Sequence, residues 1–232
     1  MRKFLIAVFT LFVTNAGSQV VLDVSAPALP PPPPITTPVV LPLMESANEL
    51  KGKVLVAAMR TGGYVLYLRH ALQIPPTTVK CDGPSLTPVG EEQARKIGAA
   101  IRELKIPIGR IRSSEPCRNR DTARLLNLGA YEINQDLNPV AAREGVDIGV
   151  ARHAQLAEPP PPGTNTLLVS HVHGSKNKSE WMHLEIAEII VYRPDGKGGS
   201  SPVARVRLEG WGELIRIAGE NRIQQGAGGF GQ

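Results

Sequence analysis

The chain has 232 residues, with 26 Lys and Arg against 21 Asp and Glu, and it is 42% hydrophobic but only 4% aromatic. This composition, although rich in Gly and Pro, is that of a globular protein and excludes collagen, a coiled coil and a multi-span membrane protein. A domain of roughly 150 to 200 residues buries about 70% of its unfolded surface, so a disulfide-dependent mini-scaffold is excluded as well. The net charge of +5 favours anionic partners. Without clustered basic residues and stacking aromatics it does not indicate nucleic acid.

The N-terminal segment predicts export. Met1, Arg2 and Lys3 precede the apolar run 4–13, and small residues follow at 16–18. This order is typical of a secretory signal peptide, and the run is too short to span a bilayer comfortably. We expect residues 1–18 to be removed, and the mature protein to be periplasmic or secreted, without stable membrane insertion.

Proline and glycine divide the rest of the chain. Eight prolines lie between Pro27 and Pro42, so residues 19–43 are predicted to be an extended linker. The folded domain is expected over 44–222. Residues 223–232 contain several glycines and are predicted to form a flexible tail.

Apolar spacing predicts three helices. A capping box at 46–49 opens the first, which ends before Gly62 and Gly63. Thr87 and Pro88 begin the second, whose apolar side reaches Leu104. The third is expected over 116–126.

Strands are predicted between these helices. Continuous apolar runs indicate strands covered on both faces, and two further runs flank a turn at 194–196 and indicate a hairpin. The predicted strands are 64–68, 108–111, 165–170, 188–192 and 203–208. Their alternation with helices predicts a three-layer α/β/α fold with a mostly parallel central sheet and an antiparallel edge.

Two arginines and two histidines lie at or near the carboxyl ends of the predicted strands. Arg69 and His70 come directly after the first strand, Arg118 lies in the first turn of the third helix, and His171 follows strand 165–170. In such sheets ligands bind beyond the carboxyl ends of the strands. Guanidinium groups match phosphate oxygens, and a neutral imidazole can attack phosphorus. The residues therefore predict a phosphate site with covalent catalysis through histidine.

The same blocks resemble a known family, and the resemblance covers about residues 64–208. The matching blocks, in order, are Leu68-Arg69-His70-Ala71, then 86–94, then Ser113-Ser114 with Cys117-Arg118 and Asp121-Thr122-Ala123, then 168–171. Together they are similar to the histidine phosphatase superfamily, which has the phosphoglycerate-mutase-like fold. The size and the expected export look most like the small exported phosphatases of bacteria.

The resemblance implies a role for each of the four residues. His70 would be the nucleophile that becomes phosphohistidine, Arg69 and Arg118 would hold the phosphoryl oxygens, and His171 would complete the pocket. It implies no metal and no cofactor, because two guanidinium groups supply the charge. The implied substrate is a small phosphorylated molecule, and the oligomeric state is left open.

Other candidates are less well defined. Ser114 and Thr122 could orient the pocket or touch phosphate. A general acid must protonate the leaving alkoxide, and Glu144 and Glu188 are equal candidates, with Asp147 behind them. Because the acid is not defined, the alternative to an exported, metal-independent phosphomonoesterase is an inactive phosphate-ligand binding protein on the same fold.

Two side questions stay open in the sequence. Cys81 and Cys117 can form a disulfide outside the cytoplasm, although a two-thiol zinc site is a less favoured alternative. His171, His173 and His183 could be read as a metal cluster, which the arginine-rich setting disfavours.

Overall fold

The computed structural model describes residues 49–75, 81, 83–139, 145, 147–172 and 184–227. The predicted signal peptide and the proline linker lie outside these residues and stay predictions, and residues 46–48 of the expected capping box lie outside them too. Within the described part of the chain, no helix is both long enough and apolar enough to cross a membrane.

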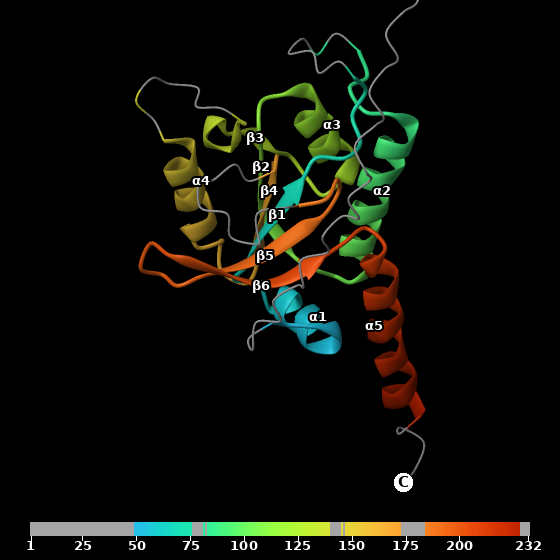
Figure 1. Ribbon diagram of the computed structural model, residues 1–232. Helices are drawn as coiled ribbons and strands as arrows, with labels where there is room; N and C mark the ends of the chain where they lie inside the picture. The colour runs from blue at the N-terminus through green and yellow to red at the C-terminus, as the bar shows by residue number, and fades with distance from the viewer. Residues whose placement is uncertain are drawn as a thin grey trace, which may run out of the picture. The chain divides into compact units, whose positions relative to one another are not determined.

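A single mixed sheet of six strands forms the centre of the fold (Figure 1). The strands follow the order β3-β2-β4-β1-β5-β6. The first four in that order are mutually parallel, whereas β5 pairs antiparallel with both β1 and β6. The predicted parallel centre with an antiparallel edge is therefore confirmed. The bounds are β1 Val65–Arg69, β2 Ile108–Ser113, β3 Glu132–Ile133, β4 Asn165–Ser170, β5 Ile189–Pro194 and β6 Ser200–Val206.

Helices cover both faces of the sheet, so the fold has the three predicted layers. Successive residues of β1 alternate between faces: Leu66 and Leu68 pack in one hydrophobic cluster, and Val65 and Tyr67 in another. The first cluster includes residues of α1 Gly52–Thr61, α2 Pro88–Glu103, α3 Cys117–Leu126 and α5 Gly210–Ala227. The second includes residues of the short 3₁₀ helix η1 Gln135–Leu137 and of α4 Ile148–Ala157. Figure 1 shows α4 on one side of the sheet and α2 on the other.

Helix α2 begins where its sequence signals place it. Thr87 caps it by accepting a hydrogen bond from the backbone N–H of Gly90 at 3.0 Å, and Pro88 is its first residue. Ala94, Ile97 and Ile101 are fully buried along one side. This packing confirms the predicted helix and fixes the segment that follows the first strand.

Several predicted boundaries differ from the structure; strand β6, for example, was expected over 203–208 and lies at Ser200–Val206. Helix α1 begins at Gly52 rather than at the capping box, because the backbone N–H of Leu50 instead donates to Val203 on strand β6 at 2.7 Å. Helix α5 continues to Ala227, five residues into the segment predicted to be a flexible tail. A single glycine inside a helix costs only about 1 kcal/mol, so Gly226 does not end it.

Four elements were not predicted at all, namely β3, η1, α4 and α5. The start of α4 does carry a readable signal, because Asp147 caps it by accepting from the N–H groups of Gly149 and Val150. Helix α5 contains Gly212 and Gly219, which obscure its apolar period.

Candidate active site

The two histidines lie side by side because strands β1 and β4 are adjacent and parallel. Arg69 is in register with Ser170, and the backbone N–H of His70 donates to the carbonyl of Ser170 at 3.0 Å. Each strand therefore delivers its histidine at the same edge of the sheet. The ring centroids of His70 and His171 are 5.4 Å apart, with the ring planes at 66°.

The tautomer of His70 follows from a hydrogen bond that its ring makes. Its Nδ1 lies 2.9 Å from the carbonyl oxygen of Ala71, which can only accept, so Nδ1 carries the proton. The lone pair is then on Nε2. Burial, followed by the charges of Arg118 and Arg69, lowers the pKa of His70 to about 4. At neutral pH the imidazole is uncharged and its Nε2 can act as a nucleophile.

His171 has the opposite tautomer. Nη2 of Arg118 can only donate, and it lies 3.1 Å from Nδ1 of His171, so Nδ1 accepts. The proton is on Nε2, which donates to Oγ of Ser114 at 2.9 Å. Burial lowers the pKa of His171 to about 2, with Arg118 the next largest cause. His171 is therefore a neutral ring oriented from both sides.

A buried polar chain continues from Ser114. Its hydroxyl donates to Oδ1 of Asn138 at 2.8 Å, and the carbonyl oxygen of Asn138 accepts from Nη2 of Arg152 at 2.6 Å. Arg152 lies on α4, its side chain is 1% exposed, and its charge also lowers the pKa of His171. Sequence analysis missed Asn138 and Arg152, because neither lies in a motif and α4 was not predicted.

Two guanidinium groups border the histidines. Nη1 of Arg69 donates to the carbonyl of Leu184 at 2.7 Å, and Arg118 contacts His171. Among the residues that the structure describes, the Nε atoms of both are buried without a hydrogen-bond partner, and no carboxylate lies within ion-pair distance of either arginine. Burial lowers the pKa of both, and Arg69 lowers that of Arg118 further. Two cations without an ion-pair partner in the described part of the chain, beside two neutral imidazoles, can hold an anion.

Thr122 connects the histidine loop to α3. Its hydroxyl donates to the carbonyl of Arg118 at 2.6 Å and accepts from the backbone N–H of Ala71 at 3.1 Å. These contacts assign Thr122 to positioning the pocket, since its hydroxyl is already used on both sides. Ser114 likewise contacts His171 and Asn138, and it reaches the site through His171.

The structure separates the three candidate acids. Glu188 is fully buried, but its carboxylate accepts from Nε of Arg205 at 2.6 Å and from the N–H of Glu185 at 2.6 Å. The contacts of Glu188 are those of a structural ion pair, although its charge raises the pKa of Arg69. Asp147 caps α4. Glu144 lies outside the described residues, as do His173 and His183.

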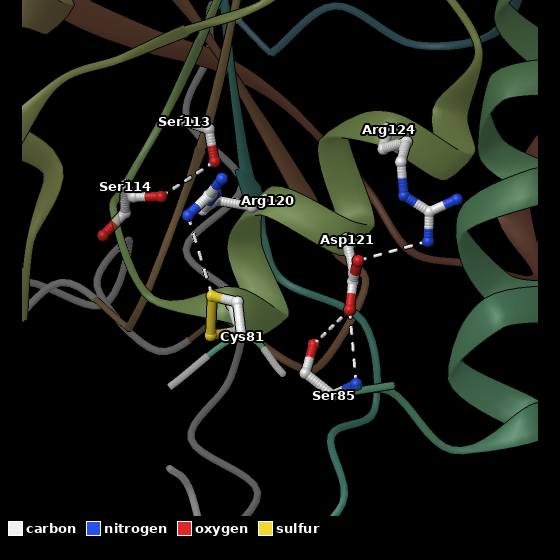
Figure 2. Close-up of a disulfide and its surroundings, with 8 residues drawn as sticks. Cys81, Ser85, Ser113, Ser114, Arg120, Asp121 and Arg124 are labelled. Atoms are coloured by element: carbon white, nitrogen blue, oxygen red, sulfur yellow. Dashed lines mark hydrogen bonds and ion pairs between the residues drawn. A yellow bond between two sulfur atoms is a disulfide. The ribbon is translucent and has the colours of Figure 1, made fainter. Parts of the chain in front are cut away.

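Cys81 and Cys117 form a disulfide, with their Cα atoms 5.3 Å apart (Figure 2). This corrects the alternative of a two-thiol zinc site, since neither sulfur is a free thiolate. Cys117 is the first residue of α3, directly before Arg118. The disulfide therefore ties the chain ahead of α2 to the helix that carries a pocket arginine.

Solved structures of phosphatases are similar to this chain. The protein histidine phosphatase SixA complexed with tungstate is 18% identical and has a TM-score of 0.49, with 62% of this chain and 97% of that chain covered. A mutant phosphoserine phosphatase from Entamoeba histolytica in complex with phosphoserine is 13% identical, with a TM-score of 0.45 and coverage of 63% and 98%. No protein-family model and no curated protein matches the chain.

Proposed function

We propose that the chain is a phosphomonoesterase of the histidine phosphatase type that works through a phosphohistidine on His70. The observation that carries the proposal is the state of His70, a buried neutral imidazole whose Nδ1–H is held by the carbonyl of Ala71. The guanidinium groups of Arg69 and Arg118 lie close enough to His70 for their charges to lower its pKa. The sequence blocks around these residues support the same assignment.

The reaction follows from these contacts. Arg69 and Arg118 hold the phosphoryl oxygens and stabilise the charge that develops on them. Nε2 of His70 forms a bond to phosphorus while the bond from phosphorus to the ester oxygen breaks, and the alkoxide leaves as an alcohol after protonation. Water then attacks the phosphohistidine, releases inorganic phosphate and regenerates the neutral imidazole. The guanidinium groups supply the positive charge, so the proposed reaction needs no metal.

The proton for the leaving alkoxide is assigned to Glu144. Of the three candidates, Glu188 is held by Arg205 and Asp147 caps α4, whereas Glu144 lies outside the described residues and stays a candidate on its place in the sequence. Glu144 follows the Arg118 block and precedes His171 in the chain.

We also propose that the enzyme acts outside the cytoplasm. The signal-like segment 1–18 predicts export, and the disulfide between Cys81 and Cys117 supports it, because disulfides persist mainly in oxidising compartments. The test is processing of the full chain, with the mature N-terminus determined after secretion.

The catalytic proposal is tested by hydrolysis of para-nitrophenyl phosphate in excess EDTA, with His70→Ala beside the native protein. We expect EDTA-resistant turnover that His70→Ala abolishes, and a radiolabelled adduct on His70 that is labile to acid. His153→Ala is the matched control, since His153 is exposed on α4 and should leave turnover unchanged. Native activity in His70→Ala would disprove the assignment.

The engagement of Glu188 by Arg205 also favours a second candidate, an inactive phosphate-binding protein. Calorimetry with inorganic phosphate separates the two. Binding to the native protein without turnover and without a phosphohistidine adduct on any aryl or alkyl phosphate would favour the binding protein.

A further inference from the structure

The start of helix α3 is tied to one short segment by two separate contacts. Cys117 forms the disulfide with Cys81, and one turn further Asp121 accepts from the backbone N–H of Ser85 at 3.2 Å and from its hydroxyl at 2.6 Å. Nη1 of Arg120 also contacts Sγ of Cys81 at 3.7 Å. Figure 2 shows these contacts along one side of α3. Cys81 and Ser85 therefore hold the helix turn that carries Arg118.

Repulsion between positive charges at the site explains why the start of α3 would need to be held. Arg118 faces Arg69, and the positive N-terminal end of α3 adds to the same field. No described carboxylate forms an ion pair with either arginine. Without a bound anion these charges repel one another and push the start of α3 away from β1. A bound phosphate removes this repulsion, whereas the disulfide opposes it when the pocket is empty.

The two sulfurs differ in accessibility. Cys81 is exposed, whereas Cys117 is 2% exposed and is the first residue of α3. Cys81 is therefore the more exposed half of the disulfide for an incoming thiolate, and the positive end of α3 stabilises the thiolate that leaves from Cys117. The exposure of Cys81 and the stabilised thiolate of Cys117 both favour thiol–disulfide exchange at this bond.

We propose that the disulfide between Cys81 and Cys117 is a thiol-exchange site that controls phosphate affinity through Arg118. A dithiol reductant attacks Sγ of Cys81, the disulfide bond breaks, and Cys117 leaves as a thiolate. The second thiol of the reductant then releases Cys81, so two electrons and two protons pass to the protein and the reductant becomes a disulfide. The oxidised protein holds Arg118 against His171, and the reduced protein releases it. This proposal rests on the phosphate pocket of the proposed function and adds its regulation.

The test compares inorganic phosphate binding by the native protein before and after reduction with dithiothreitol. We expect reduction to raise the dissociation constant about tenfold, as for the loss of one charge-assisted hydrogen bond, and reoxidation with oxidised glutathione to restore it. Phosphate should also raise the melting temperature more for the oxidised protein than for the reduced one. A dissociation constant that is the same in both states would overturn the proposal.

Two variants keep the result interpretable. The double variant Cys81→Ala, Cys117→Ala should bind phosphate like the reduced protein and be insensitive to dithiothreitol. Ser85→Ala removes the second tie, so it should have little effect on the oxidised protein but weaken binding several-fold more in the reduced protein, because neighbouring ties are not additive. If reduction and Ser85→Ala raise the dissociation constant of phosphate additively, the disulfide and the Ser85 contact hold α3 independently of each other, which contradicts this part of the proposal.

Binding and turnover separate this proposal from the phosphatase assignment. Phosphate binding that depends on redox state without any hydrolysis would retain the exchange site and contradict the phosphatase. Hydrolysis with the same phosphate affinity in both redox states would support the phosphatase and contradict the exchange site.

Discussion

Nη2 of Arg118 donates to Nδ1 of His171 at 3.1 Å, so a cation and a neutral imidazole from different elements orient each other beside His70. The contact fixes the tautomer of His171, while Nε of Arg118 is buried with no hydrogen-bond partner in the ranges that the structure describes. The pocket is therefore arranged before any anion binds, which limits the reorganisation needed when charge develops on a phosphoryl group.

Arg118→Ala should lower kcat/KM by about 10² or more, because a guanidinium that contacts the transferring phosphoryl group contributes several kcal/mol. Arg118→Lys should recover part of the loss, since an ammonium restores the charge but not the planar set of donors. Steady-state kinetics with para-nitrophenyl phosphate measures both. Arg95→Ala, an exposed arginine paired with Glu91, is the matched control and should retain native kinetics. Near-native activity of Arg118→Ala would contradict the pocket assignment.

Ser114→Ala should lower kcat/KM by roughly tenfold, because it leaves Nε2–H of the buried His171 without its acceptor. The adjacent Ser113 provides a close control. It is equally buried, but its hydroxyl donates to the backbone carbonyl of Ser114 rather than to a histidine. We expect Ser113→Ala to lose stability without a comparable loss of kcat/KM at a temperature where both variants are folded. Equal kinetic losses would show that the two serines act only through packing.

His70 and His171 should stay neutral well below pH 6. Burial and the neighbouring arginines lower their pKa values to about 4 and about 2. Imidazole resonances in NMR spectra, assigned with His70→Ala and His171→Ala, should therefore remain those of the neutral rings from pH 7 down to about pH 5. Titration of His70 near pH 6.5 would contradict the buried environment described for it.

The same shifts predict acid sensitivity of the fold. The unfolded chain binds protons at these histidines near pH 6.5, whereas the folded chain does not until about pH 4 for His70. Between these values the unfolded state holds more protons, so the free energy of unfolding falls as the pH is lowered. Urea unfolding at pH 7 and pH 5 measures the change. His70→Ala should reduce the difference between the two pH values.

The sequence predicted best those site residues that directly follow a strand. Arg69, His70 and His171 could be placed together because parallel strands end at the same edge of a sheet. Arg118 could be added because it lies in the first turn of a predicted helix. The sheet arrangement followed from continuous apolar runs in its centre and a hairpin at its edge.

The sequence could not predict interactions made by isolated residues across the fold. Arg152 reaches the site through Asn138, 14 residues earlier in the chain, and no local pattern marks either of them. Glu188 was a plausible acid until its carboxylate was found against Arg205 on the neighbouring strand, a contact set by strand pairing. The disulfide likewise depended on the distance between Cys81 and Cys117, which sequence does not give.

Gly90→Ala should destabilise the fold by about 3 kcal/mol or more, since an added Cβ would lie 2.0 Å from the backbone oxygen of Leu72. Leu72 is two residues after His70, so the displacement should also lower kcat/KM. Gly212→Ala is the matched control near the start of α5, where nothing lies within 4 Å of the added Cβ. It should be neutral or slightly stabilising in urea unfolding, because alanine favours helix. Equal stability of the two variants would contradict the packing of α2 on the histidine loop.

Glu188→Gln should affect stability rather than acid catalysis. The substitution takes the negative charge away from Arg205, whose Nε and Nη2 both donate to this carboxylate, and breaking a buried ion pair costs about 3 to 5 kcal/mol. Acid catalysis is tested by the leaving group. A para-nitrophenolate ion leaves without a proton, whereas the alkoxide from glycerol 2-phosphate needs one. The ratio of kcat/KM for these two substrates should therefore stay native in Glu188→Gln.

Glu144→Gln should be compared with Glu188→Gln by the same ratio of kcat/KM for the two substrates. If Glu144 donates the proton, its substitution should lower kcat/KM for glycerol 2-phosphate by about 10² or more while hydrolysis of the aryl ester changes little. A native substrate ratio in Glu144→Gln together with a changed ratio in Glu188→Gln would exchange the roles of the two residues. It would also require Arg205 to release the carboxylate when substrate binds.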